Sequence, residues 1–303
     1  MAMCPLTLVL LMLSPAQRIA PEPAIPVGVW YVPLADPDPD VLLKDFEVIR
    51  RAGFDSIATP IVWKDAEPKR GSYNLLTVER AIAAAGRAGL KVRVKIATDK
   101  HPEWASTAAA ATEFLDYVRR RVILYPAVVS VETAGSLETL PHERIRIGTG
   151  AGAVSLDEAR FRLWNAIADG QRGISFDDGA NGASVERLAV GEIAGVVTRN
   201  QALFGPLRPR APAAADAAVD GGDGTVVVRI LESPDAMVIV ALNPATKPQK
   251  VTLKFSPDIP EAIWQNIEEG VSVNFVMGKD GPFFTHLFAP RDVLVLTIRK
   301  KLR

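Results

Sequence analysis

The sequence is poor in the residues that form disulfides, metal sites and cysteine-based active sites. Its 303 residues include one cysteine, Cys4, and three widely separated histidines, His101, His142 and His286. A single thiol forms no intrachain disulfide, and so few cysteines and histidines disfavour a transition-metal site. We therefore expect a function that uses no metal and no other cofactor.

An excess of charge of either sign is also lacking. Lysine plus arginine and aspartate plus glutamate number 35 each, so the formal net charge is zero. Nucleic-acid binding depends on a basic surface, and we predict no nucleic-acid partner. No apolar run reaches the roughly 20 residues of a transmembrane helix, so no membrane span is predicted. A neutral ligand such as a sugar suits this balance. Composition indicates nothing about the oligomeric state.

The first residues have the pattern of an export signal. An apolar run at residues 6–13 precedes the small residues Ser14-Pro15-Ala16, although no lysine or arginine comes before it. We interpret residues 1–20 as a signal peptide and expect a secreted or periplasmic protein. The alternative is an unstructured start without a role in export.

Strand-like and helix-like segments alternate between residues 25 and 205. The alternation predicts βαβ units and a parallel sheet. Six strands and five helices are fewer than a complete eightfold barrel needs, so the predicted fold class is α/β with an incomplete (β/α) TIM-type barrel. The strands are expected at 27–32, 55–63, 91–97, 127–132, 144–148 and 173–177, and the helices at 75–88, 112–124, 184–204 and from residues 40 and 155 onward.

The remaining third of the chain differs in pattern. Residues 206–224 are rich in Pro, Ala, Gly and Asp, which is typical of a linker. Residues 225–303 contain short β-rich runs separated by turn residues every 8 to 12 positions, which predicts a small all-β sandwich.

Candidate site residues lie where the predicted barrel strands end. Function in parallel α/β barrels collects at the C-terminal ends of the strands. Aromatic faces stack on sugar rings, and a pair of carboxyl groups hydrolyses glycosidic bonds. The candidate catalytic residues are Glu132, Asp177 and Asp178, and the candidate substrate-binding residues are Trp30, Tyr31, Trp63, Asp99, His101 and Trp104.

Residues 52–105 resemble the early barrel of glycoside hydrolase family 42 β-galactosidases and related clan-A glycosidases. In that pattern a strand ends in Trp, an E-P-x-x-G-x-Y turn follows, and a helix leads to a Gly-hydrophobic pair. The later segments 158–178 and 289–298 are similar to the family's last helix and strand and to its small C-terminal β domain. The matching residues are Trp63, Glu67-Pro68, Gly71, Tyr73, Gly89-Leu90 and the Pro-x-Trp at Pro102 to Trp104.

The chain departs from the family pattern at its catalytic positions. Gly135-Ser136 stands where the family has an Asn-Glu pair, and the closest carboxylate, Glu132, comes four residues earlier. The segment that resembles the family's nucleophile strand ends at Gly148 without a carboxylate. The middle of the family barrel is missing. The resemblance therefore implies a sugar-handling scaffold more firmly than an active enzyme.

Three hypotheses follow from these residues. The first is a glycoside hydrolase acting on β-linked glycosides, with Glu132 as a proton donor whose pKa burial raises and Asp177 or Asp178 as its partner. The second is a catalytically degenerate carbohydrate-binding protein, and the third is a shortened gene product without independent activity. Glu132 could equally be a solvated strand-end residue, the Asp177-Asp178 pair a turn, and the tryptophans packing residues of the barrel rim. Glu67 is expected to order its own turn. The sugar, its linkage and the stereochemical outcome are left open.

Overall fold

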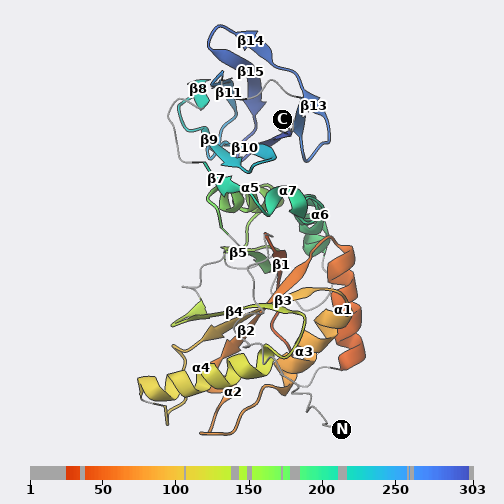
Figure 1. Cartoon of the computed structure of the whole chain (residues 1–303), viewed down its shortest axis with the longest axis vertical. Helices are drawn as coiled ribbons and strands as arrows, with labels where there is room; N and C mark the ends of the chain where they lie inside the picture. Colours follow the sequence, from red (N-terminus) through yellow and green to blue (C-terminus); the bar gives the residue numbers. More distant parts are fainter. Residues whose placement is uncertain are drawn as a thin grey trace, which may run out of the picture.

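The computed structural model describes residues 25–34, 38–105, 107–137, 143–148, 152–171, 173–177, 185–210, 217–257, 259 and 263–299. Figure 1 shows a parallel sheet with its helices at one end of the molecule and an antiparallel β structure at the other, with α5, α6 and α7 between them. Within the described residues no helix combines the length and apolar content needed to cross a bilayer.

The first region is a six-stranded parallel sheet in the order β4-β3-β2-β1-β6-β5. This order places β1 in the interior and leaves β4 and β5 as the two edges. A complete barrel has eight strands, so the described sheet is two strands short of closure. The predicted alternation is confirmed. The strands are β1 (Val27–Trp30), β2 (Ser56–Val62), β3 (Lys91–Ala97), β4 (Val128–Ala134), β5 (Glu143–Arg146) and β6 (Ile174–Asp177).

Helices follow most of these strands, and side-chain caps mark where several begin. The Asp38 carboxylate accepts from the backbone N–H of Asp40, and the Ser155 hydroxyl accepts from that of Glu158. Such bonds satisfy N–H groups that have no partner within the helix. The helices are α1 (Pro39–Arg51), α2 (Trp63–Ala66), α3 (Leu76–Arg87), α4 (Ala108–Val122), α5 (Leu156–Ala168), α6 (Val185–Arg199) and α7 (Gln201–Phe204).

The parallel sheet is strongly curved. Gly173 precedes β6, and a Cβ added there would lie 1.9 Å from the Arg93 guanidinium, which extends from β3. Two strands separate β3 from β6, and neighbouring strands are about 4.8 Å apart. An arginine side chain does not extend that far across a flat sheet. The sheet therefore bends around Arg93, as the wall of a barrel does.

The second region consists of two antiparallel sheets, as predicted for a β-sandwich. The sheets have the orders β13-β12-β16-β10-β9-β7 and β14-β15-β11-β8. The segment interpreted as a linker contains two strands, β7 and β8. They pair with β9 and β11, so this part of the segment belongs to the sandwich. The strands are β7 (Arg208–Pro209), β8 (Ala217–Gly221), β9 (Val227–Glu232), β10 (Ala236–Leu242), β11 (Gln249–Phe255), β12 (Trp264–Asn266), β13 (Ser272–Val273), β14 (Val276–Gly278), β15 (Gly281–Phe288) and β16 (Val293–Arg299).

The two regions share a continuous apolar core. Every residue of β10 is buried, because one face of this strand packs in the sandwich while Val238 and Val240 join the core that contains α5. Polar contacts support the junction. The Arg160 guanidinium donates to Glu268 and Asp292, and the Trp164 indole N–H donates to Glu268 at 2.9 Å. The sandwich is therefore fixed to the helices of the first region.

Candidate functional site

Charged side chains gather on the inner, concave face of the parallel sheet. Side chains alternate between the faces of a strand, and in β3 the residues Val92, Val94 and Ile96 pack in the apolar core. Arg93 and Lys95 therefore point to the opposite face. We define this inner face by six residues at inward positions of their strands, of which the first and the last end β1 and β6: Trp30, Arg93, Lys95, Glu132, Arg144 and Asp177.

Glu132 lies on β4 beside two cations of β3. Its carboxylate accepts hydrogen bonds from the Lys95 ammonium and, at 3.1 Å, from the Arg93 guanidinium. Burial alone would raise the Glu132 pKa, but the hydrogen bond from Lys95 and the charges of Arg93 and Lys95 outweigh it and lower the pKa. The predicted raised pKa is therefore wrong, since the sequence interpretation took account of burial and not of these cations. Glu132 is ionised at neutral pH.

The same surroundings lower the pKa of Lys95 as well, which for an ammonium disfavours the charged form. Its side chain has no exposed surface. Burial and the charge of Arg93 lower the Lys95 pKa to about 8, against the opposing effect of Glu132. Near pH 8 the ammonium therefore becomes a proton donor of moderate strength, placed next to the carboxylate.

Asp177 forms a second charged group with residues of β5. Its carboxylate pairs with Arg144, and Arg146 lies 3.9 Å from the same oxygen. The Arg144 guanidinium also lies over the Trp30 ring at 4.3 Å from its centroid. The sheet thus brings the end of β1, the end of β6 and the edge strand β5 together. Trp30 is 3% exposed, so its indole is largely covered by these neighbours.

The other predicted aromatic residues do not join the inner face. Trp63 is 2% exposed and stacks on Phe114 of α4 with a centroid separation of 5.2 Å. Trp104 meets the Trp63 ring edge-on, and its buried indole N–H has no hydrogen-bond partner among the described residues. Tyr31 packs on Phe46 of α1, where burial raises the pKa of its phenol to about 12.

The remaining predicted residues lie in loops. Asp99 and His101 are exposed after β3, and the His101 ring lies 6.3 Å from that of Trp63. Asp178 lies outside the described residues. Glu67 orders its turn, as predicted, because its carboxylate accepts from the Gly71 N–H and the Trp63 indole. Across the part of the chain that the structure describes, no group of three His, Cys, Asp or Glu could hold a metal ion.

The part of the molecule with a family match runs from the end of β1 to α4 and contains the strands β2 and β3. Residues 31–122 match the glycoside hydrolase family 42 model. The model carries the description "Beta-galactosidase". The match covers about a third of the chain and includes the segment whose motifs resemble family 42. The recognition from sequence is confirmed for that segment.

Solved structures extend the fold comparison beyond this family 42 segment. An alpha-fucosidase from Thermotoga maritima is 11% identical with a TM-score of 0.54, covering 86% of this chain and 79% of that chain. A putative alpha-N-acetylgalactosaminidase from Bacillus halodurans is 7% identical with a TM-score of 0.56 (92% and 97% covered). A family 39 glycoside hydrolase from Bacteroides cellulosilyticus is 13% identical with a TM-score of 0.51 (91% and 81% covered). The chain therefore shares its overall fold with these three solved proteins.

Sequence reasoning missed the basic half of the inner face. Arg93, Lys95 and Arg144 are the partners of the two carboxylates, yet none of them was a candidate. A signal was present in the family 42 segment, because KVRVKIA alternates apolar and basic residues. Basic residues at the inward positions of a barrel strand point to a polar site rather than a packed centre.

Proposed function

We propose that the protein hydrolyses β-linked glycosides at the C-terminal edge of the parallel sheet. The observation that carries this proposal is Glu132, an ionised carboxylate on the inner face that Lys95 and Arg93 hold in place. A carboxylate that attacks the anomeric carbon or activates water has to be ionised. Glu132 therefore takes the role of nucleophile or base, instead of the proton donor expected from sequence.

The proton donor is then the partner carboxylate at the end of β6, Asp177 or Asp178. Asp177 sits at the strand end where barrel enzymes carry catalytic groups. Arg144, whose side chain is partly exposed beside it, would contact the sugar or the leaving group. The fold shared with several glycosidases and the family 42 match supply independent support for this substrate class.

The test is hydrolysis of nitrophenyl glycosides by the full chain. We expect release of nitrophenol from β-linked substrates, galactoside among them, and a loss of about 100-fold or more in Glu132→Gln and in one of the two variants Asp177→Asn and Asp178→Asn, which identifies the proton donor. Glu47→Gln, which alters an exposed carboxylate on α1, is the matched control and should keep full activity. Hydrolysis that survives Glu132→Gln in a folded protein would remove Glu132 from the mechanism. Product NMR gives the stereochemical outcome.

A second candidate function is carbohydrate binding without hydrolysis. It is favoured by a specific observation: both described carboxylates of the inner face are ion-paired with basic side chains. For Glu132 the neighbouring cations lower the pKa, which makes this carboxyl a poor general acid. Saturable binding of a β-glycoside with no turnover over a day would support this function over the first.

We also propose that the protein is exported, on the basis of the apolar run and small residues near its start. Expression of the full chain in a bacterium with a periplasm tests this. A mature protein recovered outside the cytoplasm, with an N-terminus after residue 16, is the expected result. A full-length cytoplasmic product would contradict it.

A further inference from the structure

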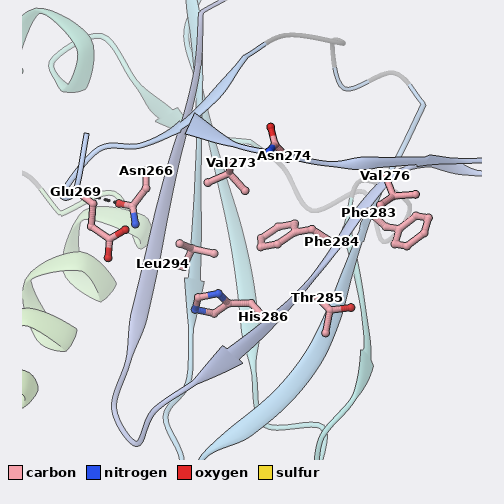
Figure 2. A pocket seen from close by; sticks show the side chains of 10 residues that line it. All are labelled: Asn266, Glu269, Val273, Asn274, Val276, Phe283, Phe284, Thr285, His286 and Leu294. Carbon is pink, nitrogen blue, oxygen red and sulfur yellow. Dashed lines mark hydrogen bonds between the residues drawn. The ribbon is translucent and has the colours of Figure 1, made fainter. Parts of the chain in front are cut away.

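A pocket of about 440 Å³ opens between the two sheets of the sandwich, far along the chain from the inner face. Figure 2 shows its lining, which comes from both sheets. Asn266, Val273 and Leu294 belong to one sheet, and β15 of the other sheet contributes Phe283 to His286. The volume lies within the roughly 300–1,000 Å³ that small-molecule sites occupy.

A buried amide provides the pocket with an oriented donor. Asn266 is 7% exposed, and its oxygen accepts from the backbone N–H groups of Glu268 at 3.1 Å and Glu269 at 3.4 Å. Two backbone donors identify that atom as the oxygen, which removes the usual ambiguity of an amide. The amide nitrogen has no hydrogen-bond partner among the described residues, and Figure 2 shows it turned away from the turn that binds the oxygen. The nitrogen is therefore free to donate to an acceptor of a bound ligand.

Together, the other polar groups of the pocket offer both donors and acceptors. Burial lowers the pKa of His286, against the charges of Asp292 and Glu269, so the imidazole is neutral and offers one donor and one acceptor. The Glu269 carboxylate accepts, and the Asn274 amide does both. The lining contains no lysine or arginine, so an anionic ligand would have no counter-charge.

Apolar surface completes the pocket. Phe283 is partly exposed, and Phe284, Val273 and Leu294 form the neighbouring walls. A sugar ring combines an apolar C–H face with hydroxyl groups that each donate and accept, which matches this mixture of surfaces. We propose that this sandwich pocket binds a neutral saccharide of one or two rings. The proposal does not depend on hydrolysis at the inner face.

Binding to the full chain tests the proposal, with D-galactose, lactose and cellobiose as the neutral probes. Titration calorimetry and saturation-transfer NMR should detect saturable binding of at least one of them. D-galacturonate and choline, an anion and a cation of similar size, should not bind. None of the three neutral probes binding, or choline binding in their place, would overturn the proposal.

Asn266→Asp is the decisive variant. The aspartate keeps an oxygen for the Glu268 and Glu269 N–H groups but replaces the donor nitrogen with an acceptor, so we expect an intact fold and a loss of about tenfold or more in affinity. Gln265→Glu is the matched control, because it adds the same charge one residue earlier on the exposed side of β12. Affinity that is unchanged in Asn266→Asp, or reduced equally in Gln265→Glu, would contradict the assignment.

A second comparison separates this site from the inner face. Glu132→Gln should bind the saccharide at the sandwich pocket as the wild type does, whatever it does to hydrolysis. Failure of hydrolysis with retained binding would therefore count against the proposed enzyme activity alone. Binding lost in Glu132→Gln but kept in Asn266→Asp would assign the saccharide to the inner face and overturn the sandwich site.

Discussion

The inner face of the parallel sheet and the interior of the sandwich are both enclosed by β-strands, but the first contains charged side chains and the second apolar ones. The inner face holds Arg93, Lys95 and Glu132 in ion pairs. The sandwich interior is apolar and rich in aromatic rings, with Trp264 and Phe275 only 3.9 Å apart by their centroids. Buried side chains are stabilised by ion pairs on the inner face and by apolar packing in the sandwich.

This difference bears on the role of the charged residues. Apolar residues of similar volume usually stabilise an interior as well as a buried ion pair does, because the pair loses its hydration. The barrels of this fold type ordinarily fill their centre with branched apolar side chains. Stability alone therefore does not account for five charged residues on the inner face. They fit the proposed function, in which this face binds a polar ligand.

The largest expected effect comes from removing the residue that joins the two regions. Trp164 has no exposed surface, packs on Phe204 and donates to Glu268 of the sandwich. Trp164→Ala should lower the free energy of unfolding by about 4 kcal/mol, from the lost burial and the cavity left behind. Calorimetry should then show two transitions where the wild type shows one. Trp164→Phe keeps most of the volume and should keep the single transition. A single transition in Trp164→Ala would mean that the regions are coupled elsewhere.

Glu132→Gln should have the next largest effect. Removing one partner of a buried pair leaves the cations of Lys95 and Arg93 uncompensated, and we expect a loss of about 3 kcal/mol in urea unfolding at pH 7. The low end of the usual range applies because the Glu132 side chain is 23% exposed.

The same substitution carries a pH signature. The Glu132 pKa in the folded protein lies below its ordinary value of 4.5, so its contribution is fully present above pH 4.5 and disappears as the pH falls through the folded-state pKa. The difference between wild type and Glu132→Gln should therefore shrink in acid. A difference that stays constant from pH 7 down to pH 3 would show that packing, not charge, is what Gln disturbs.

Gly173→Ala tests the curvature that brings the inner face together. The added Cβ would lie 1.9 Å from the Arg93 guanidinium, so Arg93 has to move. Overpacking of this kind costs about 1 to 2 kcal/mol. Arg93→Met removes the guanidinium, and in that background Gly173→Ala should cost less. Additive effects of the two substitutions would place Arg93 away from Gly173.

The elements of the fold could be predicted from sequence, whereas the contacts between distant strands could not. Periodicity is local, so KVRVKIA was recognised as the strand β3 and the runs after residue 225 as antiparallel strands. The pairing of β3 with β4 sets Lys95 opposite Glu132, and that register depends on the whole sheet. For this reason the sequence located Glu132 as a site residue but gave the direction of its pKa incorrectly.

The aromatic residues illustrate the same limit. Trp30 and Trp63 both end predicted strands, and strand-end position alone treats them alike. Trp63 begins α2 and turns toward Phe114, while Trp30 stays on the inner face with Arg144. The sandwich pocket was missed because its residues come from both sheets, and local periodicity does not show how two sheets pack on each other. The polar residues Asn266 and His286 lie 20 positions apart in a region interpreted only as a packed domain.

The smallest expected effect comes from an exposed ion pair, and comparing it with Glu132→Gln tests whether burial makes the Glu132 contacts strong. Glu47 and Arg51 form an ion pair on the surface of α1, 3.8 Å apart, with side chains 51% and 74% exposed. Water and salt screen such a pair, so Glu47→Gln should change the free energy of unfolding by no more than about 0.5 kcal/mol, and by nothing measurable in 1 M salt. The chemistry of the substitution is identical to that of Glu132→Gln, and only the surroundings differ. Equal losses at the two positions would mean that enclosure in the sheet does not set the strength of the Glu132 contacts, and the inner face would then lose its distinction from an ordinary helix surface.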